Sequence, residues 1–367
     1  MNDLEKSNEQ LCAIYVDMGT TNTRVWLLRG CEVLAQASKQ VGVRNSAQEG
    51  TTTALRATLK ELIAAVQNQA KQLLKSRAPV CVAAAGMIGS PLGLAELSHI
   101  TAPAGVRELS AAAARFEFPD VTPLPFLLVP GVRSGPIEAD FRLSDPGDVM
   151  RGEETLCVGL HALGLVEPPA VVLTLGSHWK AIRLADGKIQ ESVTSLSGEM
   201  IHAVQTETIL ASSVGNNWPD KMTPDWLEAG MTEQRRSGLS RTLFCARLLE
   251  LKNQGTPQDR FAYLLGAFIA SDLDALVARR VLADNTRVVI SGHDATARAW
   301  AFALARMSLS AVVLTEEETE KAFLAGLNQI LIEQILIGAI STGGSTISST
   351  ASSGIEGENL NGRAATS

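Results

Sequence analysis

The sequence predicts an α/β protein of two similar halves that face each other across a cleft. The chain opens with three short apolar segments joined by polar turns, followed by a helical pattern and a buried apolar segment. A strand, a polar turn and a hairpin recur after residue 170. Five prolines within residues 119–136 break regular structure, so we expect the chain to cross from one half to the other there.

The first half is predicted from its apolar pattern. Residues 12–17, 24–28 and 32–38 are rich in strand-forming residues and are separated by tight turns, which predicts an antiparallel meander. Apolar residues then recur at helical spacing over residues 55–74, and a buried strand follows at 79–86. This β-β-β-α-β order is the opening of a ribonuclease-H-like half-domain.

The second half begins in the same way. Residues 170–176 form an apolar run that ends in glycine, and Asp186-Gly187 marks the turn of the hairpin that follows. Strand patterns at 287–292 and 310–315 then alternate with helical patterns, which favours parallel pairing.

These patterns give the expected domain boundaries. We place an N-terminal ribonuclease-H-like domain at residues 1–125 and a C-terminal one at residues 126–340. Residues 341–367 are rich in Gly, Ser, Thr and Asn and have almost no apolar content, which predicts a disordered tail.

Composition narrows the function. With 46% hydrophobic residues among 367, the chain can form two domain cores. Its net charge of −7 argues against a nucleic-acid partner, although small phosphorylated ligands need only a few local donors. The five scattered cysteines favour neither a disulfide framework nor a structural zinc site. The polar N-terminus, together with a longest apolar candidate (residues 323–340) that polar side chains interrupt, predicts a cytoplasmic protein without a membrane partner.

The first candidate site is the turn DMGTTN between the first two predicted strands. Gly19 allows close approach of the backbone to a ligand, and the hydroxyl and N–H groups of Thr20, Thr21 and Asn22 can hold phosphate oxygens. Asp17, at the end of a buried strand, can hold Mg²⁺ through water, which would offset its repulsion of phosphate. An ordinary hairpin turn has a similar composition.

A second candidate site, LGSHWK, occupies the corresponding turn of the second half. Gly176, Ser177, His178 and Lys180 would supply the other side of a split phosphate clamp, with one loop on each domain. Taken alone, His178 would be a surface histidine in a turn.

The third candidate site, SGHDA, runs from a strand into a helix. Gly292 and His293 can approach a flat ligand, and the helix start is suited to anionic oxygens. The alternative is a simple turn capped by Asp294.

The fourth candidate site is DVMRGEET, which we expect to open a helix. A carboxylate here, Glu153 or its rival Asp148, could act as a general base by accepting the proton of an attacking hydroxyl. The alternative is that these acidic residues only stabilise the start of the helix.

Three of these segments together resemble a known superfamily. DMGTTNTR is similar to phosphate loop 1 of the sugar kinase, hexokinase and actin superfamily, GSHWK to phosphate loop 2, and SGHDAT to its adenosine loop. The resemblance implies two actin/hexokinase-type domains with ATP bound in the cleft between them.

A closer resemblance extends to about residue 335. The segments GMIGS (86–90), APAG (102–105), DVMRGEET (148–155), GSHWK (176–180), SGE (197–199) and YLLG (263–266) resemble the 2-keto-3-deoxygalactonate kinase family. The family transfers phosphate from ATP, with Mg²⁺, to the 6-hydroxyl of 2-keto-3-deoxygalactonate in galactonate catabolism.

The family resemblance implies roles for particular residues. ATP would contact the three loops through Gly19, Thr20, Thr21, Asn22, Gly176, Ser177, His178, Lys180, Gly292 and His293. The sugar acid would contact Gly86, Met87, Gly89, Ser90, Arg133, Arg151 and Glu199. Asp17 would hold the metal. Related sugar kinases have a Gly-Asp pair where this chain has Gly152-Glu153, so Glu153 is the expected base.

The chain also departs from the family pattern. Met18 stands where the family commonly has Trp, Leu94 replaces an aromatic residue, and Trp179 stands where loop 2 usually has Ser. We expect the larger side chain of Trp179 to narrow the cleft beside the phosphates.

Two other functions remain open at this point. Exopolyphosphatases of the same superfamily carry a similar Gly-x-Glu-Glu segment and use a glutamate to activate water, but a long polyanion needs a basic channel. A non-catalytic, actin-like ATP-binding regulator would not need the acidic residues of DVMRGEET. The sequence leaves a homo-oligomer open.

Overall fold

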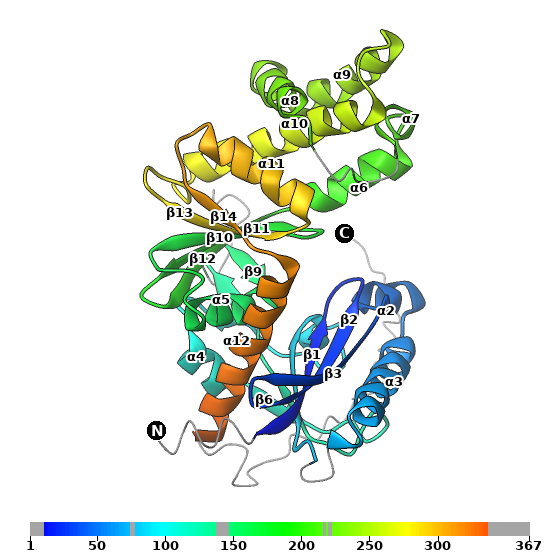
Figure 1. Ribbon diagram of the computed structural model, residues 1–367, viewed down its shortest axis with the longest axis vertical. Helices are drawn as coiled ribbons and strands as arrows, with labels where there is room; N and C mark the ends of the chain where they lie inside the picture. Colours follow the sequence, from blue (N-terminus) through cyan, green and yellow to red (C-terminus); the bar gives the residue numbers. More distant parts are fainter. Residues whose placement is uncertain (1–10, 74–77, 137–146, 216–217, 219–221, 337–367) are drawn as a thin grey trace, which may run out of the picture.

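The computed structural model describes residues 11–73, 78–136, 147–215, 218 and 222–336 (Figure 1). The tail predicted at residues 341–367 lies outside the described residues. Figure 1 shows the first sheet, in blue and cyan, below the second sheet and its helices.

The first sheet has six strands in the order β3-β2-β1-β4-β7-β6. Its strands are β1 (Cys12–Met18), β2 (Thr23–Arg29), β3 (Glu32–Lys39), β4 (Val82–Gly86), β6 (Ala114–Phe116) and β7 (Phe126–Leu128). The first three strands form the predicted antiparallel meander, and β1 pairs in parallel with β4. Because β7 pairs with β4, the boundary expected after residue 125 falls just before a strand of this sheet.

The second sheet repeats this arrangement in the order β12-β11-β10-β13-β14. Its strands are β10 (Ala170–Leu175), β11 (Trp179–Ala185), β12 (Lys188–Ser195), β13 (Arg287–Gly292) and β14 (Ala311–Val313). The hairpin strands are antiparallel, whereas β10, β13 and β14 are parallel. The second sheet therefore has the order of the first five strands of the first sheet, to which β6 is added, and this confirms the prediction of two ribonuclease-H-like halves.

Two helices lie between the sheets and share one core with both. They are α5 (Glu153–Ala162) and α12 (Glu316–Leu336). Strand alternation directs Tyr15 of the first sheet and Val172 of the second toward this shared core, where they join Leu160 and Leu327.

The last helix, α12, completes the core of the N-terminal half. The Tyr15 hydroxyl donates a hydrogen bond to Asn328 Oδ1 at 2.7 Å, and the Ser110 hydroxyl donates to the carbonyl oxygen of Ile330 at 3.1 Å. The rings of Trp26 and Phe323 lie 6.1 Å apart. Both halves thus pack against one helix. The turn after β1 and the turn after β10 lie on facing sides of the two halves.

The remaining helices lie beside the sheets or pack against other helices. On the N-terminal side are α2 (Val43–Glu49), α3 (Thr53–Gln69), α4 (Val106–Ala112) and the 3₁₀ turn η2 (Met87–Gly89). On the C-terminal side are α6 (Ser197–Glu207), α7 (Ala211–Val214), α8 (Pro224–Ser237), α9 (Leu239–Leu251), α10 (Pro257–Ala278) and α11 (Asp294–Ala305).

The helix α10 corrects one expectation from the sequence. It is long and apolar enough to cross a membrane, whereas the sequence pointed to residues 323–340 as the longest candidate. Most of α10 is buried within the C-terminal half, where Phe261, Phe268 and Leu273 pack in the second core.

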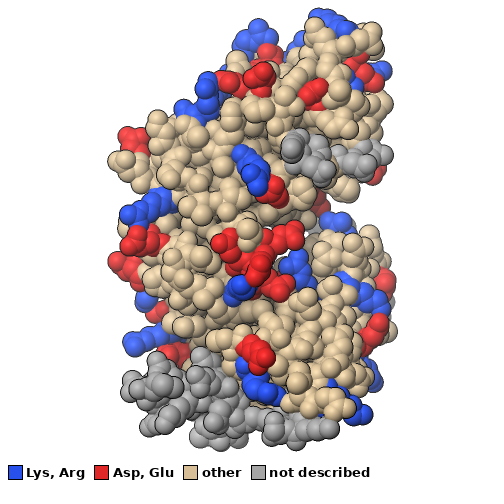
Figure 2. All heavy atoms as spheres, in the orientation of Figure 1, with Lys and Arg blue, Asp and Glu red and all other residues tan. Residues whose placement is uncertain are grey.

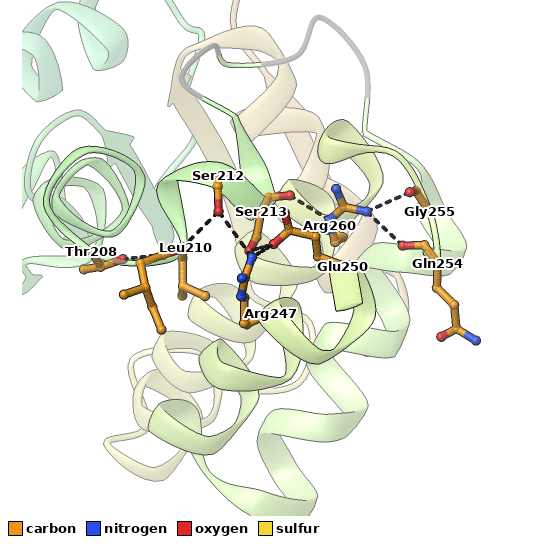
Figure 3. Close-up of polar contacts among 10 residues, drawn as sticks. Thr208, Leu210, Ser212, Ser213, Arg247, Glu250, Gln254, Gly255 and Arg260 are labelled. Carbon is orange, nitrogen blue, oxygen red and sulfur yellow. Dashed lines mark hydrogen bonds and ion pairs between the residues drawn. The ribbon is translucent and has the colours of Figure 1, made fainter. Parts of the chain in front are cut away.

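A polar network, in which Arg260 is buried and Arg247 and Glu250 are partly exposed, fastens α7, α9 and α10 together (Figure 3). Arg260 donates hydrogen bonds to the carbonyl oxygens of Ser213 at 2.6 Å and Gly255 at 2.7 Å. Glu250 accepts a hydrogen bond from the Ser213 hydroxyl and pairs with Arg247, and these contacts lower its pKa. Every charged group of the network has a partner within it, which indicates a structural role.

A small third sheet joins the two halves on the side of the cleft. It consists of β5 (Ile100–Thr101), β8 (Val132–Ser134) and β9 (Asp148–Met150). Asp148 therefore lies on a strand, and not on the helix expected from the sequence, which begins at Glu153.

Candidate active site

Three segments meet around Asp17 at the carboxyl end of β1. A Cβ at Gly86 would lie 2.6 Å from the Met18 carbonyl oxygen and 3.3 Å from Asp17 Oδ1, and the φ of Gly86 is +85°. A Cβ at Gly152, whose φ is +107°, would lie 3.4 Å from the Gly86 Cα. Glycine is therefore required at both positions, because it alone permits this approach and these left-handed conformations.

The carboxylates of Asp17 and Glu153 lie near each other. Burial raises the pKa of Asp17 to about 6; the charge of Glu153 adds to this increase, and Arg24 opposes it. Mg²⁺ is usually held by one or two carboxylates together with waters and phosphate oxygens. A pair of half-buried carboxylates beside a glycine-rich loop fits such an ion, whose charge would offset their repulsion.

Glu154 has a different role from Glu153. Its buried carboxylate accepts hydrogen bonds from the Gly152 N–H, with both oxygens 2.8 Å from the nitrogen. Burial raises the pKa of Glu154 to about 8, Glu153 adds to the increase, and the Gly152 N–H and Arg151 oppose it. Glu154 thus stabilises the start of α5 from the core, whereas Glu153 stays partly exposed.

We expect stability to depend on the protonation of Glu154. Its folded pKa of about 8 exceeds the ordinary value of 4.5, so over this window the unfolded chain binds fewer protons and stability falls as pH rises. Glu154→Gln removes this contribution. Between pH 4.5 and about 8, the free energy of unfolding of the variant minus that of the wild type should increase by at most about 1.4 kcal/mol per pH unit. Denaturant titrations at about pH 5 and pH 8 measure this difference, and a pH-independent difference would contradict it.

A cluster of positive charge surrounds His99, beside the candidate substrate segments. Burial lowers the pKa of His99 to about 4, and Arg151, Arg133 and Lys180 lower it further. His99 is therefore neutral at pH 7, and its Nδ1 lies 3.4 Å from Arg151 Nη2. Three cations around one neutral ring make this part of the cleft suitable for an anion.

Arg151 carries the most informative atom of this cluster. Its Nη2 donates a hydrogen bond to the Leu97 carbonyl oxygen. Its Nη1 is buried without a hydrogen-bond partner among the described residues, and a Cβ at Gly89 would lie 3.2 Å from it. An unpartnered guanidinium nitrogen is costly, so an acceptor from a bound ligand would be favourable here.

The other residues of GMIGS form the turn beside Arg151. Met87 is half-buried in η2, and the buried Ser90 hydroxyl donates a hydrogen bond to the Met87 carbonyl oxygen at 2.7 Å. Arg133 Nε donates to Thr101 Oγ1 at 3.0 Å. The predicted sugar-side residues Gly86, Gly89 and Arg151 are thus brought together by the contacts described above.

Lys180 lies apart from loop 2, to which the sequence assigned it. Its buried ammonium group donates to the Val149 carbonyl oxygen at 2.9 Å and to Thr194 Oγ1 at 2.6 Å. Thr194 in turn donates to Asp148 Oδ2 at 2.8 Å. Lys180 and Asp148 therefore belong to one hydrogen-bonded group under the third sheet, next to the His99 cluster.

The phosphate and adenosine loops lie at the ends of neighbouring strands. Gly19 donates its N–H to the Asn22 carbonyl oxygen at 2.8 Å, which closes loop 1, and Thr20 and Thr21 lie on its accessible side. Leu175 and Gly292 are paired residues of β10 and β13, so loop 2 and the adenosine loop begin side by side.

A cavity adjoins the adenosine loop. It has a volume of about 470 Å³ and is lined by residues of α8 and α11, including Leu227, Ala299 and Phe302. The His293 ring lies 5.9 Å from that of Trp218. Asp294 forms an ion pair with Arg298 at 2.8 Å at the start of α11.

The departures from the family pattern are core residues. Trp179 is 4% exposed and packs edge to face against Trp300, with ring centroids 5.7 Å apart. The expectation that Trp179 narrows the cleft is therefore wrong, because strand alternation turns its side chain into the C-terminal core. Met18 and Leu94 are buried in the N-terminal core.

Three further site residues went unnoticed in the sequence. His99, Thr194 and Arg44 occur in segments without a glycine-rich or acidic motif, and only the fold brings them to the cleft. For Arg44, which lies 4.0 Å from Glu199, the one available signal was its position as a basic residue shortly after the third strand of the meander.

Comparisons with known proteins show the family of this chain. A model of the 2-keto-3-deoxy-galactonokinase family matches residues 17–330. A protein of Rhizobium meliloti (strain 1021), whose name assigns it to 2-dehydro-3-deoxygalactonokinase, is 28% identical over 323 residues, covering 85% of this chain and 94% of that protein. The 2-dehydro-3-deoxygalactonokinase of Escherichia coli (strain K12) is 24% identical over 294 residues, covering 78% and 87%.

A solved structure extends the comparison to the fold. The crystal structure of a Sinorhizobium meliloti protein assigned to the same activity matches with a TM-score of 0.69 at 24% identity, covering 92% of this chain and 99% of that one. Since the family model covers most of its length, this chain belongs to the 2-keto-3-deoxy-galactonokinase family, as its motifs predicted.

Proposed function

We propose that this protein transfers the γ-phosphoryl group of ATP to the 6-hydroxyl of 2-dehydro-3-deoxygalactonate, in the cytoplasm, as a step of galactonate catabolism. The observation that carries the proposal is the juxtaposition of two groups in one cleft. The carboxylates of Asp17 and Glu153 adjoin loop 1, and a cationic cluster around Arg151 adjoins the GMIGS turn. A kinase for a sugar acid needs both a base and a carboxylate-binding site.

In the proposed reaction, Glu153 accepts the proton of the 6-hydroxyl as its oxygen attacks the γ-phosphorus, and the bond from the γ-phosphorus to the bridging oxygen of ADP breaks. Loops 1 and 2 hold the phosphates from opposite sides. Asp17 would hold Mg²⁺ through water, and the bound ion would supply charge neutralisation and alignment of the phosphates. Arg151 and Arg133 bind the substrate carboxylate. Lys180, which is hydrogen-bonded to the Val149 carbonyl oxygen, adds positive charge beside them. The nucleobase occupies the cavity between α8 and α11.

Surface charge supports a small substrate over a long polyanion. On the face shown in Figure 2, acidic side chains gather over the start of α12, and Lys and Arg are scattered. The first turn of α12 contains Glu316, Glu317 and Glu318. A polyphosphate chain would be repelled from this part of the surface.

ADP release separates the candidate functions. The purified protein is incubated with ATP, Mg²⁺ and a panel of sugar acids that differ in chain length and stereochemistry. We expect ADP release that depends on 2-dehydro-3-deoxygalactonate. Phosphate release from polyphosphate would favour the exopolyphosphatase function, and ATP binding without turnover on any acid would favour the regulator.

We expect Arg151→Gln to weaken binding of the sugar acid. Loss of a charge-assisted pair should raise its KM roughly ten- to a hundredfold and leave the KM for ATP nearly unchanged. Steady-state kinetics with each substrate varied in turn measure the two constants. Arg235→Gln, which breaks a surface ion pair with Asp274, is the control. An equal rise in both KM values would contradict a specific role at the carboxylate.

A further inference from the structure

The helix α2 is held tightly against loop 1. A Cβ at Gly42 would lie 2.4 Å from the Thr20 carbonyl oxygen, so the chain at this point contacts the loop backbone directly. The N–H of Val43 donates to the Gly19 carbonyl oxygen at 3.3 Å, and that of Arg44 to the Thr20 carbonyl oxygen at 3.0 Å. The position of the Arg44 main chain is therefore tied to that of loop 1.

Loop 2 is held in a matching way by α6. A Cβ at Gly198 would lie 2.2 Å from the Gly176 carbonyl oxygen. The N–H of Glu199 donates to the Ser177 carbonyl oxygen at 2.7 Å. In both halves, the helix that follows the third strand of the meander thus supports the phosphate loop and carries one charged residue beside it.

These two charged residues meet across the cleft. Arg44 Nη2 lies 4.0 Å from Glu199 Oε1, and His178 Nε2 lies 3.3 Å from Glu199 Oε2. Figure 1 shows α2 and α6 on opposite sides of the gap between the halves. One carboxylate therefore lies between two nitrogen donors, at the place where the two loops face each other.

The contacts of Glu199 with Arg44 and His178 are weak enough for a bound ligand to replace them. The side chains of Arg44, His178 and Glu199 are 42%, 44% and 51% exposed. Exposed ion pairs contribute little to stability, and at 4.0 Å the Arg44 pair lacks a short hydrogen bond. A polyphosphate offers more charge and more acceptor oxygens than one carboxylate, and a guanidinium can bind it with two parallel hydrogen bonds.

We propose that Arg44 is a ligand of the nucleotide phosphates, and that Glu199 holds its guanidinium between the two loops until the nucleotide enters. Glu199 is then a positioning residue of the phosphate side, in place of the substrate role that the family resemblance implied. This inference rests on the proposed kinase function. It assigns to loop 1 a cation that its own sequence, DMGTTN, lacks.

The two residues should have opposite effects on nucleotide binding. Arg44→Gln should raise the Kd of Mg·ADP and of a non-hydrolysable ATP analogue about tenfold, as expected for one lost charge-assisted contact. Glu199→Gln should lower both Kd values several-fold, because the competing carboxylate is gone. The double variant should resemble Arg44→Gln. Titration calorimetry measures all three.

Matched controls separate this effect from a general change of charge. Arg107→Gln removes an arginine from a comparable exposed pair, 3.9 Å from Glu333 on α12. Glu207→Gln removes an exposed carboxylate at the other end of α6. Neither should change the Kd of either nucleotide.

Two results would overturn the inference. One is an unchanged nucleotide Kd in Arg44→Gln, which would leave the pair as a surface contact between the halves. The other is a Glu199→Gln variant that raises the KM of the sugar acid alone, which would return Glu199 to the substrate. Failure of the proposed function is a separate outcome: the wild type would then release no ADP with any sugar acid, while the calorimetric comparison could still be made.

Discussion

Replacing Glu153 by glutamine is expected to lower turnover by roughly 10²–10⁴-fold, the contribution typical of a positioned general base. A primary alcohol is a poor nucleophile at pH 7, and glutamine cannot accept its proton. Since Glu153 lies at the cleft beside Asp17, its loss should leave nucleotide binding largely intact. Steady-state turnover and the Kd of Mg·ADP, measured on the same preparation, give the two quantities.

Two neighbouring acids serve as controls for this result. Glu154→Gln alters a buried carboxylate that binds the Gly152 N–H, so it should affect stability more than rate. Asp148→Asn changes a carboxylate that already accepts hydrogen bonds from Thr194 and from the N–H of Val149. If Asp148→Asn is inactive and Glu153→Gln is active, the base is Asp148, and the kinase proposal survives without its present mechanism.

Asp17→Ala is expected to abolish phosphoryl transfer with little loss of folding. The proposed role of this carboxylate is to position Mg²⁺, so the effect should appear in turnover at saturating ATP. Burial raises the pKa of Asp17 to about 6, so at pH 7 the folded protein holds a carboxylate that its surroundings disfavour. Removal of this group should therefore leave the melting temperature unchanged or raise it.

The Asp17 experiment needs turnover, melting temperature and a matched control. Asp225→Ala removes an exposed aspartate from the first turn of α8 and should retain full turnover. A folded Asp17→Ala protein with near-normal turnover in Mg·ATP would remove Asp17 from the mechanism. An unfolded one would be followed by Asp17→Asn, which keeps the shape of the side chain.

The parts of the fold that were predictable have local causes. The meander of residues 12–38 is visible because turn residues separate apolar runs of strand length, and its repeat after residue 170 identified the second half. Loops 1 and 2 could be predicted for the same reason, since each consists of adjacent residues. Gly19 and Gly176 each follow a buried strand, and the pairing of Leu175 with Gly292 places loop 2 beside the adenosine loop.

The parts that were missed depend on contacts between distant segments. Asp148 lies on a strand of three residues, which is too short to show an alternating pattern against the helix that follows. Lys180 belongs to a loop by sequence, but its long side chain reaches under β9 to Val149. The cationic cluster around His99 combines residues from three separate segments, so no single window of the sequence contains it.

The position of α12 has a consequence for synthesis of the chain. Tyr15 and Trp26 lie near the beginning of the sequence, and their partners Asn328 and Phe323 lie on the last described helix. A ribosome releases these partners only after it has made the 313 residues that separate Asn328 from Tyr15. Until then the hydroxyl of Tyr15 and one face of the first sheet lack their native cover. The N-terminal half therefore cannot complete the core that it shares with α12 until that helix has been made, although the core on the other face of its sheet contains residues 12–128 alone.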